Sequence, residues 1–442
     1  MLAGGTRRRN RRYLMAMNEI PAARSPRLRI ALVAPPQEPV PPPGYGGTER
    51  VVGALTDVLV TRGHDVTLFA SGDSTAAASR LVPTVPRALR PAGQLPDPWA
   101  GYLVATAANV LRRAGEFDVI HSHLEWISLL LARSTRIPVV MTFHGRLDLP
   151  FAADAFSGAP RGLVAISRSQ AAAHPQLPWA GVVHNGLDLT GAPFDERPGE
   201  DLCFVGRIAP EKGIVDAIEV ARLSGRRLRI AAKVGRMPEE RAYYDDVFLP
   251  ATKTAEVELL GELSGNDRDR LLAESYATLM PGKWPEPFGL VAIESLACGT
   301  PILARPAGAL PEIIRDGVDG FFGEDANVLA RWVPRISGLD RAAIRSSVLE
   351  RFSAARMTDG YEAVYRRFVG APGRSGSEVV VDQDRERESE LGTAGGSRQR
   401  PDPAAHRLDE RAAHEQADAG AGGLGGGRRR SVIELEEPPD LG

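Results

Sequence analysis

The sequence lacks the features that point to a secreted or membrane-spanning protein. It contains only two cysteines, Cys203 and Cys298, both in apolar stretches, which favours buried free thiols over a disulfide framework. No run approaches the ~18 apolar residues needed to cross a bilayer. The basic N-terminal run is not followed by the apolar core of a secretory signal. We therefore expect a cytoplasmic protein without stable membrane insertion.

The sequence also lacks an excess of charge of either sign. The 54 Lys and Arg residues nearly balance the 56 Asp and Glu residues, so the formal net charge is −2. Nothing in this balance argues for nucleic acid as a partner. The hydrophobic fraction of 43% and the charged fraction of 25% are those of a soluble globular protein. The 442 residues are enough for two or three domains of ~150 residues each.

Aromatic residues are absent after Phe368. The segment 372–442 is rich in Gly, Ala, Arg, Asp and Glu and cannot bury enough apolar surface to offset its ordering entropy. We predict that this tail is disordered. Residues 1–27 are likewise expected to be an unstructured extension.

Between these ends, short apolar runs alternate with helical patterns, which predicts buried parallel strands joined by helices. A polar linker that contains proline, 191–199, separates two such series. The sequence therefore predicts an α/β fold of two Rossmann-like doubly wound domains, 28–190 and 191–371, facing across a cleft. The expected strands are 28–34, 63–69, 118–121, 137–142, 162–166, 201–205, 228–232, 257–260, 277–280 and 301–304.

A glycine-rich loop follows the first strand, in the segment 44–50. Its spacing fits neither the dinucleotide fingerprint nor a P-loop. Gly46 and Gly47 would still let the backbone approach a ligand closely, and a helix beginning near Thr48 would offer free N–H groups to an anion. A simple tight turn explains the loop equally well.

Two cations, Arg207 and Lys212, follow the first strand of the second series. Isolated cations are usually solvated. At a strand–loop–helix junction, however, both can reach a diphosphate lying over the strand end, and this position favours a binding role.

The segment 281–301 is the most informative stretch. Pro287 places Glu286 in a loop, and a helix is expected from about residue 289 to 297, ended by Gly299. Glu294 then lies inside that helix among apolar neighbours, where a carboxylate must be paired or bound to a ligand. The alternative is a buried ion pair with a core arginine.

Over residues 28–370, these motifs in this order resemble the family 4 retaining glycosyltransferases, which have the GT-B fold. The E-x7-E motif matches Glu286 and Glu294, and the phosphate-binding loop of the family matches 206–213. The last helix is expected to return to the N-terminal domain. Further family-like pieces are Gly46-Gly47, 119–123, 142–145, 166–167 and 184–188.

The resemblance implies roles for individual residues. Glu294 would hold the donor ribose and Glu286 the sugar hydroxyls, while Arg207 and Lys212 would neutralise the leaving diphosphate. His123, or alternatively His121, would contact the sugar, although a lone histidine is more often structural. His144 and Ser167 are left as acceptor-side or supporting residues. The implied catalytic group is Glu286, His123, Arg207 and Lys212, and the donor site is Gly46, Gly47, Gly206, Arg207, Lys212, Phe288, Gly289, Leu290 and Glu294.

No metal and no cofactor are expected, as in most members of the family. Asp267 and Asp269 form one Asp-x-Asp match, but acidic residues at a helix start suit the helix dipole. A second match, Asp382 and Asp384, lies in the tail. Neither is interpreted as a metal site.

The predicted function is that of a retaining hexosyltransferase that uses a UDP-, GDP- or ADP-linked sugar and an acceptor the sequence does not identify. A sugar-nucleotide 2-epimerase of the same fold is the first alternative, and it should lack the loop around Arg207. A non-catalytic nucleotide-sugar binding protein is the second, and the intact set of charged residues argues against it. A nicotinamide oxidoreductase lacks its fingerprint.

Overall fold

Two parallel sheets organise the part of the chain described by this computed structural model, which covers residues 27–44, 46–92, 99–197, 199–235 and 237–369. All of these residues lie within one compact unit of the chain. The predictions made for residues 1–26 and 370–442 lie outside the described residues. Two Rossmann-like α/β domains are confirmed, while their predicted boundaries stay a prediction.

The first sheet, within the described residues, has seven parallel strands in the order β3-β2-β1-β4-β5-β6-β7. Its strands are β1 Arg29–Val33, β2 Asp65–Ser71, β3 Arg80–Val85, β4 Val119–Ser122, β5 Val139–Thr142, β6 Leu163–Ala165 and β7 Trp179–Val182. The helices that accompany it are α2 Gly47–Thr61, α3 Trp99–Arg112, η1 Ala114–Glu116, α4 Ile127–Arg133, α5 Ala152–Ala155 and α6 Arg168–Ala172.

The second sheet has six parallel strands, counted over the described residues, in the order β10-β9-β8-β11-β12-β13. Its strands are β8 Leu202–Ile208, β9 Leu228–Val234, β10 Val257–Gly261, β11 Ala277–Met280, β12 Ile302–Ala304 and β13 Gly320–Phe322. The helical segments are η2 Pro210–Lys212, α7 Ile214–Ser224, α8 Pro238–Tyr243, η3 Tyr244–Phe248, α9 Leu249–Thr252, α10 Gly265–Glu274, α11 Leu290–Ala297, α12 Leu310–Ile313, α13 Ala326–Trp332, η4 Val333–Gly338, α14 Arg341–Arg351 and α15 Ala354–Val369.

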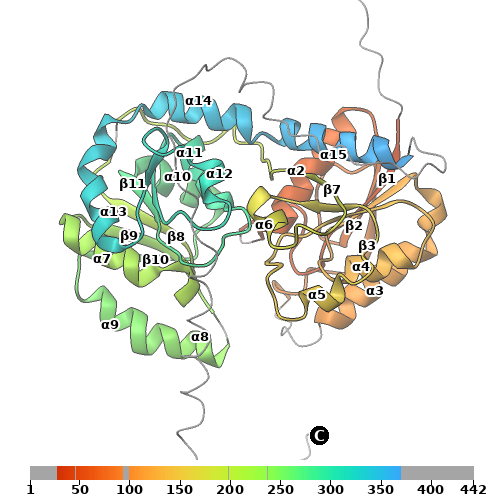
Figure 1. The fold of residues 1–442 in the computed structure, drawn as a ribbon, viewed down its shortest axis with the longest axis horizontal. Coiled ribbons are helices and arrows are strands. Elements are labelled where there is room, and N and C mark those ends of the chain that lie inside the picture. The colour runs from red at the N-terminus through yellow and green to blue at the C-terminus, as the bar shows by residue number, and fades with distance from the viewer. Residues whose placement is uncertain (1–26, 45, 93–98, 198, 236, 370–442) are drawn as a thin grey trace, which may run out of the picture. The chain divides into compact units, whose positions relative to one another are not determined.

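Helix α15 packs against α2, β4 and β7 of the first sheet, although it follows α14 of the second (Figure 1). Its Tyr361 and Tyr365 are fully buried there. Arg62, at the end of α2, pairs with Asp359 at 2.7 Å. The chain therefore closes the first domain with a helix that follows the second sheet in the sequence.

Both sheets reverse their strand order beside a central strand, β1 in the first and β8 in the second. In the first sheet β1 lies between β2 and β4, and in the second β8 lies between β9 and β11. Ligands of doubly wound sheets bind outside the carboxyl ends of strands at such reversals. The loops after β1, β4, β8 and β11 are therefore the places to look for a site.

Candidate active site

The loop between β1 and α2 brings backbone N–H groups to the end of the first sheet. Gly46 has a φ of 138°, and a Cβ on it would lie 2.9 Å from Pro42 Cγ, so glycine is required there. Helix α2 begins at Gly47 without a side-chain cap. The first-turn N–H groups of a helix lack partners within the helix, which makes this end suited to an anion. A Cβ on Gly47 would lie 3.2 Å from Leu290 Cδ1, so the loop approaches α11 of the second sheet.

Arg207 and Lys212 lie at the end of β8 and in η2, and both line one cavity of about 420 Å³. Arg207 donates to Glu211 Oε1 at 2.6 Å and to Glu240 Oε1 at 3.2 Å. Lys212 Nζ donates to Glu286 Oε2 at 2.7 Å and lies 4.2 Å from the centre of the Trp284 ring. Both cations are thus held in the cavity by carboxylates that a diphosphate would have to replace or share. Gly206, beside Arg207, lines the same cavity.

Glu286 lies in the loop between β11 and α11, as its place before Pro287 predicts. Besides Lys212, Trp284 Nε1 donates to Glu286 Oε2 at 2.9 Å. The backbone carbonyl of Glu286 accepts from Ala309 N at 2.8 Å. A Cβ on Gly308 would lie 2.2 Å from the backbone nitrogen of Glu286, so the two loops are packed backbone to backbone. The carboxylate therefore has a fixed position.

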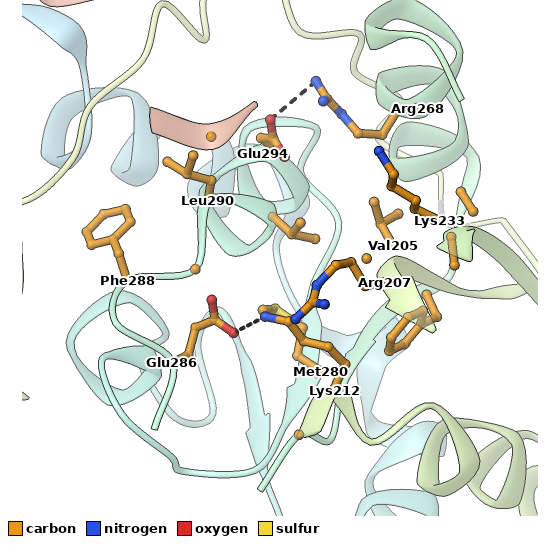
Figure 2. Close-up of a pocket in the computed structure, with 18 of the residues that line it drawn as sticks. Val205, Arg207, Lys212, Lys233, Arg268, Met280, Glu286, Phe288, Leu290 and Glu294 are labelled. Atoms are coloured by element: carbon orange, nitrogen blue, oxygen red, sulfur yellow. Dashed lines mark hydrogen bonds and ion pairs between the residues drawn. The ribbon is translucent and has the colours of Figure 1, made fainter. Parts of the chain in front are cut away.

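Helix α11 begins at Leu290, after Gly289 with its left-handed φ of 99°. Leu290 faces the cavity (Figure 2). Phe288 also belongs to the cavity wall, but its side chain is 2% exposed and packs on His184 and Phe352. The structure thus places the Phe288 ring in the core, where it supports the loop.

Glu294 lies on α11 and is 4% exposed. It forms ion pairs with Arg50 of α2 and with Arg268 of α10, the latter at 3.2 Å. This is the buried ion pair that the sequence left open as an alternative to ribose binding. A buried carboxylate requires such partners. The ribose role of Glu294 remains a prediction. Figure 2 shows Arg268 pointing at Glu294 and Lys212 at Glu286, at separate places in the cavity.

The two histidines at the end of β4, His121 in the strand and His123 just after it, differ in what they contact. His121 uses both ring nitrogens, with Tyr365 Oη at 2.7 Å and Thr142 Oγ1 at 2.8 Å. His123 Nδ1 lies 2.9 Å from His144 Nε2, and its Nε2 has no hydrogen-bond partner among the described residues. His121 is therefore occupied by the fold, and His123 keeps a nitrogen for a ligand.

Burial sets the charge of this cluster. Desolvation lowers the pKa values of His121 and His123 well below the usual range and the pKa of His144 to about 4. Each imidazole is therefore neutral near pH 7. A neutral His123 can donate or accept a hydrogen bond but brings no positive charge to a ligand.

Ser167 serves the fold. Its hydroxyl donates to the carbonyl of Pro287 at 2.7 Å and accepts from the backbone N–H of Gln170 at 3.0 Å, capping α6. It thus joins the first domain to the loop that carries Glu286. His144 is different, because it lines the large cavity.

The sequence analysis gave no role to several polar residues of the cavity wall, among them Arg50, Arg268, Lys233 and Asn185. Arg50 and Arg268 pair with Glu294, and Lys233 lies 3.7 Å from Glu262. Asn185 is buried, and its Oδ1 is unpartnered in the part of the chain that the structure describes. Strand-end position could have signalled Lys233, which belongs to β9. The partners of Glu294 leave no such signal.

The Asp-x-Asp match at the start of α10 is used locally. Ser264 Oγ lies 2.6 Å from Asp267 Oδ2, and Arg268 donates to Asp269 at 2.8 Å. Over residues 27–369, apart from the gaps, there is no group of three or more His, Cys, Asp or Glu side chains placed to hold a metal ion. The match at Asp382 and Asp384 lies outside the described residues. No helix in this part of the chain has both the length and the apolar character to cross a bilayer.

Two protein-family models match the chain, one on each sheet. The model described as Glycosyltransferase Family 4 matches residues 45–190, and the model described as Glycosyl transferases group 1 matches residues 195–331. Among curated proteins, the D-inositol 3-phosphate glycosyltransferase of Mycobacterium tuberculosis is 30% identical, with 82% of this chain and 88% of that protein covered. The same protein of Mycobacterium bovis matches equally.

Solved structures share the fold. A glycosyltransferase involved in avilamycin A biosynthesis is 26% identical, with a TM-score of 0.59 over 78% of this chain and 99% of that chain. An Anabaena protein solved in complex with UDP and glucose is 18% identical, with a TM-score of 0.59 over 76% of this chain and 98% of that chain. The resemblance of the second shows the fold alone.

Proposed function

This chain belongs to the family 4 glycosyltransferases with the GT-B fold, and on that premise we propose that it is a retaining hexosyltransferase using a UDP-, GDP- or ADP-linked sugar. Its glycosyltransferase activity follows from membership. The kind of sugar, the stereochemical course and the acceptor are the proposal. That a related fold is known with UDP and glucose supports testing UDP-sugars first.

One observation carries the proposal. The uncapped start of α2, the cations Arg207 and Lys212, and the carboxylates Glu286 and Glu294 all line the same cavity of about 420 Å³. The positive groups match a diphosphate, and the carboxylates match sugar and ribose hydroxyls. A cavity of this size holds a ligand of the nucleotide-sugar class.

The proposed reaction separates charge. The bond between the anomeric carbon and the diphosphate oxygen breaks, leaving positive charge on the sugar and negative charge on the nucleoside diphosphate. Arg207, Lys212 and the α2 N–H groups would stabilise the leaving diphosphate, and fixed groups of this kind usually supply the largest part of catalysis. The contacts of Lys212 with Glu286 and Trp284 hold its ammonium group at the cavity, which supports a role in stabilising the diphosphate.

Retention would follow if the acceptor hydroxyl attacks from the face that the diphosphate leaves. A new carbon–oxygen bond then forms on that face, and the hydroxyl proton passes to a departing phosphate oxygen. The sugar contact of His123 stays a prediction, because this residue lines a neighbouring cavity and not the one that holds Arg207 and Lys212. No observation specifically favours the 2-epimerase or the non-catalytic binding protein.

A donor screen followed by product analysis tests the proposal. Thermal shift with UDP-, GDP- and ADP-sugars should reveal one preferred base, because a ligand at 100 times its dissociation constant stabilises by about 2.7 kcal/mol. Proton NMR of the product formed from that donor should show the donor's anomeric configuration. An inverted product, or transfer of a sugar other than a hexose, would refute the corresponding part of the proposal.

A further inference from the structure

A second cavity, of about 260 Å³, adjoins the donor cavity on the side of the first sheet. The segment Gly46 to Thr48 lines both cavities. If the donor diphosphate lies at the start of α2, the second cavity opens on the reacting end of the donor. It is therefore the place for the acceptor, and this step rests on the proposed function.

Its walls carry an excess of carboxylates. Glu38, Glu49 and Glu125 line the cavity, and Arg90 is the one arginine or lysine among the described lining residues. Arg90 Nη1 lies 3.1 Å from Glu38 Oε1, so its charge is already balanced. Glu49 and Glu125 then remain as acidic groups facing the space. Because charges interact more strongly in a site shielded from water, ionised carboxylates on its walls disfavour an anionic ligand.

These carboxylates are held in place. Glu49 is 5% exposed. Glu125 accepts from the backbone N–H of His144 at 2.9 Å and has a φ of 50°, which is uncommon outside glycine and marks a strained position. Burial raises the pKa of each to about 7. An ammonium group would favour their ionised forms, whereas an anion would oppose them.

The cavity also contains polar atoms that await a partner. His123 is fully buried, and in the described residues neither its Nε2 nor Gln37 Oε1 has a hydrogen-bond partner. Both residues line this space. Buried polar atoms are normally satisfied, so these two point to a ligand that brings hydroxyl or amino groups. Such a ligand can donate to Gln37 and exchange a hydrogen bond with His123.

We propose that this cavity binds the acceptor and selects a polyol that is uncharged or carries an amino group, excluding phosphorylated and carboxylated acceptors. Above pH 7, where Glu49 and Glu125 are ionised, the carboxylates accept from hydroxyl or ammonium donors and their charge repels an anion. By excluding phosphorylated acceptors, the chain would differ from the D-inositol 3-phosphate glycosyltransferases that it resembles, whose name includes a phosphorylated compound.

Ligand-observed NMR titration of the full chain, saturated with UDP, tests the selection. The probes are glucose, glucosamine and glucose 6-phosphate, which share one ring and differ in charge. We expect glucosamine to bind most tightly and glucose 6-phosphate at least tenfold more weakly than glucose. Equal or tighter binding of glucose 6-phosphate, or no binding of glucose and glucosamine, would overturn the proposal.

Two substitutions with opposite expected effects on binding distinguish a change in the site from a loss of folding. Glu38→Gln removes a negative charge and should weaken the binding of glucosamine several-fold. Arg90→Gln removes a positive charge and should strengthen that binding, which unfolding cannot do. Glu256→Gln removes one exposed charge outside the cavity and should change nothing. Unaltered glucosamine binding in both cavity variants would count against the proposal. If UDP in these samples and every nucleotide sugar of the donor screen failed to bind, the proposed function would be refuted instead, so the two failures are distinguishable.

Discussion

Arg207 and Lys212 each face a carboxylate in the structure, Arg207 with Glu211 and Lys212 with Glu286. Their charges are held at the cavity but remain partly exposed to solvent. A diphosphate that develops charge as it leaves would draw on both. Their contribution should therefore be larger in the transition state than in binding of the donor.

We predict that Arg207→Ala and Lys212→Ala each lower kcat by a factor of about 10². Arg222→Ala is the matched control, because Arg222 is an exposed arginine of α7 paired with Glu219. Steady-state turnover, measured with and without EDTA, checks the loss in the two variants and the independence from metal. Chelation should leave the rate unchanged. Wild-type turnover in either variant, or a rate abolished by EDTA and restored by metal, would contradict the assigned diphosphate site.

The buried carboxyl of Glu49 should make stability depend on pH. Burial raises its pKa from 4.5 to about 7, so the folded chain keeps a proton that the unfolded chain releases. This contribution is present below pH 4.5 and is lost as the pH rises through 7. Compared with Glu49→Gln, the wild type should lose on the order of 3 kcal/mol between pH 5 and pH 8.

Chemical unfolding of both proteins at those two pH values measures the difference. The comparison must be between variants, because buried His144 acts in the opposite direction. Its pKa is lowered to about 4, so stability falls as the pH drops from 6.5 toward 4. An unchanged difference between wild type and Glu49→Gln would show that Glu49 is ionised throughout.

The local structure around individual site residues could be predicted from the sequence where motif spacing indicated it. The E-x7-E spacing and Pro287 predicted a loop glutamate and a helical glutamate, and the structure shows both. The partners of Glu294 were not predictable, because Arg50 lies 244 positions away in the chain. A long-range ion pair leaves no local pattern. The sequence could state only that Glu294 needs a partner or a ligand.

At the level of helices and strands, the strand predictions failed at three of the four sheet edges, and only the edge strand β10 was predicted, as 257–260. The strands β3, β7 and β13 were missed, and each is the last strand at one edge of its sheet. An edge strand has a neighbour on one side only, so it needs no continuous apolar run. Strand β3 contains Pro83, which a central strand would not tolerate, and β13 has three residues. The central strands were predicted because burial on both faces demands apolar runs.

Helix α15 connects the end of the described chain to the histidine cluster. Tyr365 Oη lies 2.7 Å from His121 Nδ1, and the His121 ring contacts the His123 ring at a tilt of 40°, with 4.1 Å between ring centres. This helix therefore positions the histidines from outside the sheet. The Tyr365 hydroxyl forms a hydrogen bond with buried His121 Nδ1, which would otherwise have no partner.

We predict that Tyr365→Phe lowers the free energy of unfolding by roughly 1–3 kcal/mol, the cost of leaving a buried polar atom unsatisfied. Tyr243→Phe on α8 is the control, because its side chain is only partly buried and should matter little. Thermal or urea unfolding measures both. Equal stability of Tyr365→Phe and the wild type would mean that His121 finds another partner.

On the scale of the whole molecule, the site arises because two sheets each reverse their strand order. The loops that follow β1 and β5 meet those that follow β8 and β11, and one cavity is lined from both sheets. Fold class was predictable because alternating strands and helices admit few topologies. The charge of the acceptor cavity was not, because Glu38, Glu49 and Glu125 meet only once the first sheet is folded.

The central claim is that the large cavity binds a nucleotide sugar, with Glu294 at the ribose and Glu286 at the sugar. Calorimetry of UDP, or of the nucleoside diphosphate of the preferred donor, with Glu294→Ala and Glu286→Ala tests it most directly. Glu294→Ala should weaken binding at least tenfold, since each lost hydrogen bond to a charged group costs about 1.5–3 kcal/mol. Glu286→Ala should bind like the wild type while losing turnover, because free nucleotide has no sugar to contact. Undiminished binding by both would contradict the account and leave Glu294 as the structural partner of Arg50 and Arg268.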